Sequence, residues 1–232
     1  WDAPDNIGCC YTTRIGGYSK NKFSHSNLSY DVGDSRVNVR KNREELKKSL
    51  NLEYEPVWMK QIHSSYIRKV TESSKDLVSD SCYTSTIGLA CAVLSADCLP
   101  ILLCNSSGSK VGVIHTGWRG LANGIIPKFI TRFSKNPKDV ICWIGPSISP
   151  DNYLVREDVY KKLIKISSKI FTKHDTERWN LDLKLAAKML LKSKGVNKIF
   201  TDDMCTYQNS NLYYSYRGEN NTGRIASLIW IK

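Results

Sequence analysis

Two histidines and one cysteine stand in three compact motifs that lie far apart in the chain. The motifs occupy residues 60–63, 95–98 and 113–120. Their candidate ligands are too widely separated for a zinc finger, so only a folded scaffold can bring them together. Imidazole and thiolate suit zinc, and three protein ligands leave a fourth position open for water or substrate. The pattern therefore predicts a catalytic metal centre formed by His63, Cys98 and His115.

The length and hydropathy of the chain limit its architecture. It has 232 residues, of which 41% are hydrophobic, enough to bury a substantial core without stabilising disulfides or structural metals. We expect residues 1–232 to form a single domain. No apolar run approaches the roughly 20 residues that a membrane helix needs, and the first residues do not resemble a secretory signal. We expect a protein without a membrane partner, monomeric or weakly homo-oligomeric.

The cysteines indicate a reducing environment. There are eight, and most lie in apolar, strand-like runs such as residues 91–94. No pair has the CxxC spacing of a zinc ribbon or a thioredoxin-type site. We therefore expect reduced, mostly buried thiols and a cytoplasmic protein.

The net charge of +12 raises the question of a nucleic-acid partner. The lysines are scattered along the chain rather than gathered in one stripe, and no aromatic-basic motif of a known nucleic-acid reader is visible. A nucleic-acid-binding module is therefore the less favoured alternative. The same charge would steer an anionic small substrate toward the protein.

Hydrophobic periodicity predicts a mixture of strands and helices. Strands or extended segments are expected at residues 8–18, 57–70, 87–94, 99–103, 111–115, 141–144, 199–200, 212–216 and 225–231. Helices are expected at about 36–50 with Asp34 as N-cap, after Gly120, at 156–170, and at 183–191 before Gly195. Pro127 either kinks the second of these helices or begins a new one. Without strict alternation of strands and helices, the mixture favours an α+β or α/β fold.

Further polar residues flank the candidate ligands. Asp97 precedes Cys98 and could orient a ligand, act as general base, or cap a turn. Gly117 and Gly120 permit a close backbone approach after the second histidine. Arg14 and Arg119 are candidates for holding an anion, because a guanidinium binds phosphate through two parallel hydrogen bonds. An ordinary salt bridge is the alternative for either arginine.

A series of short motifs, all in the same order, carries a resemblance to a known family along essentially the whole chain. They occupy residues 12–17, 27–29, 32–34, 42–43, 61–63, 96–100, 115–120, 145–146, 205–207, 214–217 and 222–224. In these motifs the chain resembles the YfiH family, long labelled multicopper polyphenol oxidase or laccase-like and later assigned as purine nucleoside phosphorylases. Gly218 departs from the family pattern, in which a second arginine often follows Arg217.

The resemblance implies an α+β fold in which mixed sheets pack as a sandwich flanked by helices. It implies a catalytic zinc held by the three ligands named above, with copper as a possible occupant of a His/Cys site. It also implies phosphorolysis of adenosine, inosine and S-methyl-5'-thioadenosine to the base and (methylthio)ribose 1-phosphate, with adenosine deamination as a side activity. The implied catalytic residues are His63, Asp97, Cys98 and His115, and the implied substrate or phosphate contacts are Arg14, Asn27, Gln61 and Arg119.

Two other enzyme classes remain as alternatives. Cys98 and His115 could act without metal as the nucleophile pair of a hydrolase or amidase, for example one that edits cytoplasmic peptidoglycan precursors. A copper-binding polyphenol oxidase is the other. The chain has only four histidines, which cannot supply the many imidazoles of a four-copper centre.

Overall fold

The structure is a computed structural model that describes residues 1–232. It contains twelve strands and six α-helices. The strands are β1 (Ile7–Tyr11), β2 (Ile67–Lys69), β3 (Ser81–Thr84), β4 (Cys91–Ser95), β5 (Leu99–Asn105), β6 (Val111–Thr116), β7 (Val140–Ile144), β8 (Leu154–Arg156), β9 (Phe171–Lys173), β10 (Arg178–Leu181), β11 (Lys198–Thr201) and β12 (Ile225–Ile231). The helices are α1 (Arg36–Ser49), α2 (Trp118–Ala122), α3 (Ile125–Phe133), α4 (Glu157–Leu163), α5 (Leu183–Ser193) and α6 (Tyr216–Glu219).

The strands form three sheets. The largest has six strands in the order β11-β7-β5-β6-β3-β2 and is mixed, because its two outer pairs are parallel and its inner pairs antiparallel. A three-stranded antiparallel sheet has the order β1-β12-β4, and a second small sheet has the order β8-β10-β9. The chain crosses from the β1-β12-β4 sheet to the six-stranded sheet between β4 and β5.

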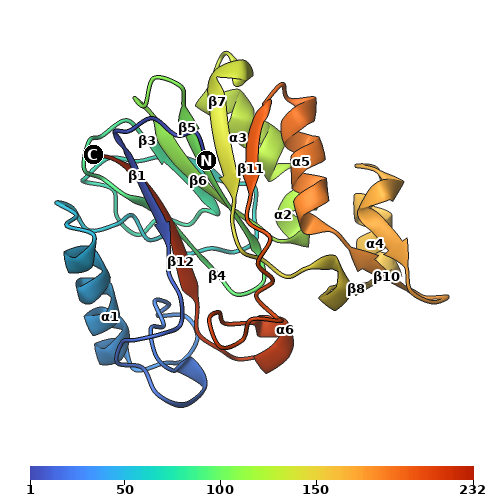
Figure 1. Ribbon diagram of the computed structural model, residues 1–232, viewed down its shortest axis with the longest axis horizontal. Coiled ribbons are helices and arrows are strands. Elements are labelled where there is room, and N and C mark those ends of the chain that lie inside the picture. The colour runs from blue at the N-terminus through green and yellow to red at the C-terminus, as the bar shows by residue number, and fades with distance from the viewer.

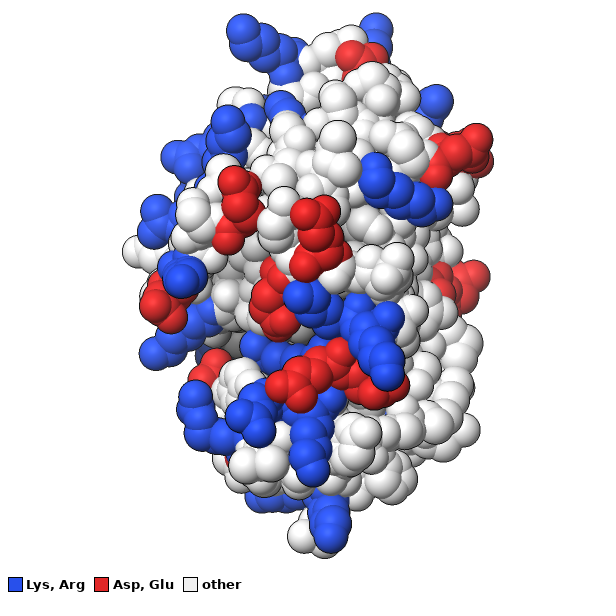
Figure 2. Space-filling view, turned by 90° about the vertical axis from the view of Figure 1, so that its left-hand side faces the viewer, with Lys and Arg blue, Asp and Glu red and all other residues white.

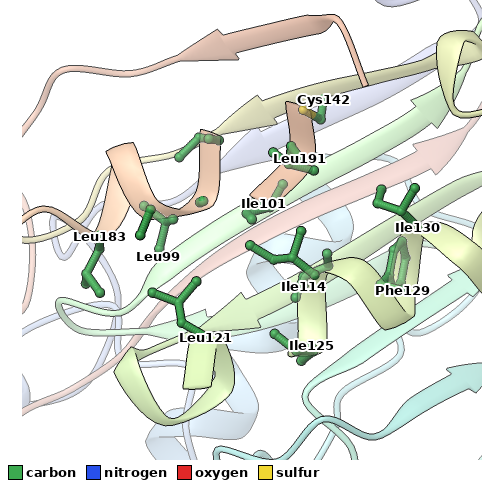
Figure 3. Close-up of a cluster of buried hydrophobic side chains, with 14 of the residues drawn as sticks. Leu99, Ile101, Ile114, Leu121, Ile125, Phe129, Ile130, Cys142, Leu183 and Leu191 are labelled. Atoms are coloured by element: carbon green, nitrogen blue, oxygen red, sulfur yellow. The ribbon is translucent and has the colours of Figure 1, made fainter. Parts of the chain in front are cut away.

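One face of the six-stranded sheet is covered by helices. Alternate residues of β5 point to this side, as expected from the period-two geometry of a strand, and they pack with side chains of α2, α3 and α5. Figure 3 shows Leu99, Ile101 and Ile114 of the sheet facing Leu121 and Phe129 of the helices. In Figure 1, α5 is seen beside β11, on the side of the sheet that also carries α2 and α3.

The opposite face packs against the β1-β12-β4 sheet. Leu102 and Val113 of the large sheet meet Val93 and Ile229 of the small one in a second buried cluster. On the outer face of the small sheet, Leu228 belongs to a third hydrophobic cluster, against which the last turn of α1 packs. The predicted α+β fold, with mixed sheets packed as a sandwich and flanked by helices, is confirmed.

Several element predictions need correction. Asp34 is not the N-cap of α1, because Ser35 occupies that position and the Asp34 carboxylate accepts from Ser19 and Asn27 instead. The predicted helix at 156–170 ends at Leu163, since Ser167 is extended and caps a new turn. Residues 212–216, expected as a strand, form none. Tyrosines in this segment are buried without strand pairing. Residues 57–70 contain the short strand β2 and isolated bridges at Val57 and Lys60, in keeping with the expected extended segments.

The ambiguity at Pro127 is resolved by two separate helices. The first, α2, ends at Ala122, and Gly124 in the left-handed region (φ 72°) precedes α3. Pro127 lies in the first turn of α3, where the missing backbone N–H has no partner to lose. The new-start interpretation is therefore confirmed.

The thiols, the helices and the surface charge bear on the expectations drawn from composition. All eight cysteines are free, and five of them are buried. None of the helices has the length and apolarity needed to span a bilayer. The face seen in Figure 2 mixes Lys and Arg with Asp and Glu rather than presenting one continuous basic stripe.

Phe129 is expected to be among the most important core residues. Its ring lies against Gly112 of β6, where an added Cβ would come within 2.7 Å of Phe129 Cζ. We expect Phe129→Ala to lower the free energy of unfolding in urea by about 3–5 kcal/mol, because the glycine cannot fill the cavity. Phe129→Leu should cost clearly less. A loss below about 1 kcal/mol for the alanine variant would contradict this packing role.

Candidate metal centre

Strand pairing brings Cys98 and His115 together. Cys98 ends the turn from β4 to β5, and His115 lies on β6, where it pairs with Pro100 of β5. Asp97, in the same turn, has φ 85°, which sharpens the reversal. The thiol and the imidazole therefore meet at one end of the six-stranded sheet.

A buried carboxylate, Asp80, brings in the third residue. Asp80 immediately precedes β3, and its carbonyl accepts from the backbone N–H of His115 at 2.7 Å. Its Oδ1 accepts from the His63 backbone N–H at 3.0 Å and contacts His115 Nδ1 at 2.9 Å, while its Oδ2 accepts from Ile62, Ser64 N and Ser64 Oγ. Asp80 is fully buried. One carboxylate thus holds the backbone of one histidine and the ring of the other.

The three predicted ligands form a compact group. One donor atom from each of His63, Cys98 and His115 lies within 4.8 Å of the others. Cys98 Sγ is 3.8 Å from His63 Nε2, and the imidazole ring centroids are 5.0 Å apart. Zinc bonds of about 2.0–2.3 Å in a tetrahedron imply a sulfur–nitrogen separation of about 3.5 Å. With Nδ1 of His115 bonded to Asp80, its Nε2 is left for a ligand bond. The donor set fits such a metal.

The charges within the group support one another. Burial opposes the Cys98 thiolate, but the neighbouring His115 and His63 outweigh burial and lower the pKa of Cys98 to about 6. Burial likewise opposes the His115 cation, but the thiolate and Asp80 raise the pKa of His115 to about 9. Burial would raise the pKa of Asp80, yet its hydrogen bonds and the His115 charge lower it to about 2. Metal binding would displace the proton from His115.

The absence of a side chain at Gly117 leaves room for the side chains of Cys98 and His63. A Cβ at this position would lie 2.8 Å from Cys98 Sγ and 3.3 Å from His63 Cδ2. We expect Gly117→Ala to weaken Zn²⁺ affinity about tenfold or more, because both side chains must shift from their ligand positions. Competition with a chromophoric chelator measures this affinity. Gly120→Ala is the matched control, since the nearest atom to its Cβ would be Ile125 Cγ2 at 3.4 Å. Equal affinities in the two variants would contradict the prediction.

A cavity opens over the three ligands. Its volume is about 550 Å³, within the range of small-molecule sites. Apolar side chains of Val32, Met59, Leu94 and Ala96 line part of it, together with Ser29 and Asp31. Trp118, Tyr153 and Tyr216 contribute aromatic side chains. The cavity therefore combines apolar walls with a few polar groups above the candidate metal centre.

Three arginines line the same cavity: Arg119, Arg217 and Arg224. The Arg119 guanidinium lies 4.4 Å from the centroid of Trp118, and Arg217 lies 5.1 Å from that of Tyr153. Burial lowers the pKa of Arg224, against the opposing effect of Cys98 and Asp97. Guanidinium groups that converge on one cavity are suited to binding an oxyanion.

Two of the predicted substrate or phosphate contacts lie outside this cavity. Arg14 donates to the Ser24 and Ser210 carbonyls and pairs with Glu219 at 2.8 Å. Asn27 is fully buried, and its Oδ1 accepts from the backbone N–H of Arg224 at 2.9 Å. Both side chains bind other parts of the chain and do not line the cavity.

Gln61, Arg119 and Asp97 do line the cavity. Gln61 donates to the Leu94 carbonyl and accepts from its N–H, at 2.8 and 2.7 Å, so its amide joins the His63 loop to β4. The Asp97 carboxylate accepts three hydrogen bonds from residues 206–217. Of these three residues, only Arg119 has a side-chain polar group without a hydrogen bond in the chain.

Sequence reasoning gave no role to Asp80, Tyr153, Arg217 or Arg224. Arg217 and Arg224 lie within the motifs that resemble the YfiH family, and this position could have marked them as site candidates. Asp80 carries no such signal in the local sequence. Its importance comes from the pairing of β3 with β6, which places Asp80 beside His115.

Comparisons with known proteins agree with this geometry. Residues 8–232 match the family model described as multi-copper polyphenol oxidoreductase laccase. The chain is 36% identical to the Escherichia coli (strain K12) protein named purine nucleoside phosphorylase YfiH, over 100% of this chain and 96% of that one. The crystal structure of a Neisseria meningitidis protein matches with a TM-score of 0.95 and 33% identity, covering 100% of this chain and 97% of the other.

A second solved structure is equally similar in fold. YlmD from Geobacillus stearothermophilus has a TM-score of 0.94 and 32% identity, and the match covers 98% of this chain and 93% of that one. The family model, the relatives and the structures all extend over nearly the full length. The chain therefore belongs to the multi-copper polyphenol oxidoreductase laccase family, in which the YfiH proteins are found.

Proposed function

We propose that this chain is a zinc-dependent purine nucleoside phosphorylase acting on adenosine, inosine and S-methyl-5'-thioadenosine. The observation that carries the proposal is the single cavity that joins a His-Cys-His group to three arginines. The first would provide a metal centre and the second an oxyanion site, and the two together suit attack by phosphate on a nucleoside. Several full-length relatives are named purine nucleoside phosphorylases, which supports the same choice.

Each part of the cavity has a role in this proposal. Arg119, Arg217 and Arg224 bind inorganic phosphate, with one of its oxygens directed at the ribose. The apolar wall at Val32 and Met59 receives the flat base. A cavity of about 550 Å³ accommodates a nucleoside and phosphate together.

The reaction is a displacement at the anomeric carbon. A phosphate oxygen forms a bond to that carbon while the carbon–nitrogen bond breaks, and its electron pair leaves with the purine. The arginines keep the phosphate oriented and stabilise the charge in the transition state. Burial, together with the charge of Cys98, raises the pKa of Tyr153, so its phenol stays protonated and can donate a hydrogen bond to bound substrate.

Zinc held by His63, Cys98 and His115 would supply a Lewis acid at the base of the cavity. The same site would account for adenosine deamination as a side activity. Copper is the other metal such a donor set accepts. Free thiols throughout the chain agree with a cytoplasmic location.

The test uses purified protein of measured metal content. We expect hypoxanthine from inosine and adenine from adenosine to appear only when inorganic phosphate is present, with an equal amount of ribose 1-phosphate. Ammonia release from adenosine, assayed without phosphate, measures the deaminase activity. Fully metal-loaded protein that turns over none of the three nucleosides would contradict the proposal.

The other enzyme classes give different results in the same test. Metal-free protein that turns over no nucleoside would favour the hydrolase or amidase built on Cys98 and His115, with a peptidoglycan precursor as substrate. A four-copper oxidase is disfavoured, because the candidate metal group includes only two of the four histidines. His25 and His174 lie outside it.

A further inference from the structure

The carboxylate of Asp97 is hydrogen-bonded to a distant part of the chain. Thr206 Oγ1 donates to Oδ1 at 2.6 Å. Ser215 Oγ and the Arg217 backbone N–H donate to Oδ2 at 3.0 and 2.6 Å. Asp97 is only 7% exposed and has φ 85°, a conformation that asparagine and aspartate tolerate better than other side chains. Such a strained, buried residue at a cavity points to a functional constraint.

Two of those donors begin the segment that carries most of the positive charge in the cavity. We name residues 215–224 the arginine arm, because Tyr216, Arg217 and Arg224 all line the cavity from it. Ser215 is the N-cap of the short helix α6, and its Oγ also accepts from Gly218 N. The contact with Asp97 therefore sets where the arm begins.

The rest of the arm is held at several further points, among them the Leu154 carbonyl, which accepts from the Arg217 guanidinium at 3.0 Å. Glu219, near its middle, pairs with Arg14 at 2.8 Å. Asn27 Oδ1 accepts from Arg224 N at the far end, at 2.9 Å. The arm is thus fixed by three side chains from other parts of the chain, and Asp97 is the one that adjoins the metal centre.

We propose that Asp97 is a positioning residue that fixes Arg217 relative to Cys98, and so sets where a bound oxyanion lies above the metal centre. Its backbone adjoins the Cys98 ligand, while its carboxylate holds the main chain of Arg217. A general base needs a free lone pair aimed at the substrate proton, whereas three of the roughly four lone-pair sites of this carboxylate already accept from donors within the protein. That the oxyanion is inorganic phosphate rests on the proposed function.

Two substitutions at one position separate these roles. Asp97→Ala removes all three contacts, and we expect the Kd and KM for phosphate to rise about tenfold or more. Asp97→Asn keeps an oxygen for the Arg217 N–H, suits the same φ, and can donate to Thr206 Oγ1. It should restore phosphate affinity to within about threefold of wild type. Calorimetry with inorganic phosphate gives Kd, initial rates give KM and kcat, and metal analysis should show unchanged zinc.

Other outcomes would overturn the proposal. If both variants lost about 10²–10⁴ in kcat with unchanged phosphate affinity, Asp97 would be a general base. If both kept wild-type phosphate affinity, the contact would not position Arg217. Wild-type protein that binds phosphate without turning over nucleosides would contradict the proposed function alone, since the Kd comparison still tests Asp97. Wild-type protein that binds no phosphate would contradict both.

A second pair of variants protects the test if Asp97→Ala fails to fold. Ser215→Ala removes a contact between Asp97 and the arginine arm, and we expect it to weaken phosphate binding severalfold. Thr206→Val is the matched control, because it removes the Asp97 contact that lies outside the arm. A larger effect of Thr206→Val than of Ser215→Ala would overturn the proposal.

Discussion

Replacing Cys98 with alanine is expected to abolish both metal binding and nucleoside phosphorolysis. The variant leaves two imidazoles at a site that has three donor atoms within 4.8 Å, and a two-ligand site does not retain zinc against a mild chelator. A metal ion contributes several kcal/mol to transition-state stabilisation, so kcat/KM should fall by about 10³ or more. Elemental analysis and chromatographic detection of hypoxanthine measure the two effects on one preparation.

Cys9→Ala is the control for this substitution. Cys9 lies on β1, is partly buried, and does not belong to the candidate metal group, so its variant should keep metal and activity. Full zinc content with full activity in Cys98→Ala would contradict the metal centre. Retained zinc with lost activity would instead identify Cys98 as a nucleophile.

Replacing Asp80 with asparagine is expected to weaken zinc binding and to destabilise the fold. An asparagine can accept at one oxygen only, so its NH₂ group must face N–H groups that now donate to the other carboxylate oxygen. Loss of the carboxylate partner of a metal-binding histidine typically costs about 10–100-fold in metal affinity. Removing one partner of a buried ion pair costs about 3–5 kcal/mol of stability. Chelator competition and urea unfolding of metal-free protein measure these two quantities.

Asp175→Asn is a suitable comparison. It breaks the exposed ion pair with Arg178 and should change neither zinc affinity nor stability measurably. Wild-type zinc affinity in Asp80→Asn would show that the carboxylate does not orient His115. Loss of affinity without loss of stability would show that orientation of the ring, rather than support of the loop, is its main contribution.

The local sequence was sufficient for elements whose signals are local. The apolar runs that became β5, β6 and β12 could be recognised because strands buried on both faces leave no polar positions. A new helix with Pro127 in its first turn was one of two options at this proline, because that turn tolerates a missing N–H. Residues 212–216 were wrongly predicted as a strand, because aromatic side chains can be buried without a neighbouring strand. Here Ser215 Oγ and the Arg217 N–H donate to the Asp97 carboxylate instead of to a strand.

The candidate site divides in the same way. His63, Cys98 and His115 could be chosen from the sequence because imidazole and thiolate carry their metal chemistry whatever surrounds them. The roles of Arg14, Asn27 and Asp97 could not, because a charged or amide side chain binds whichever partner the fold sets beside it. Arg14 pairs with Glu219 and Asn27 accepts from Arg224, and both partners are remote in the sequence.

What the sequence by itself determined is therefore the inventory: the candidate ligands, most of the strands and helices, and the family. Only the tertiary structure decided which polar groups stay free to meet a substrate and which hold the protein together. Asp80 is the clearest case, since strand pairing alone places it beside His115. The physical reason is that hydrogen bonds and ion pairs depend on distance in space, and sheet register sets that distance between residues remote in sequence.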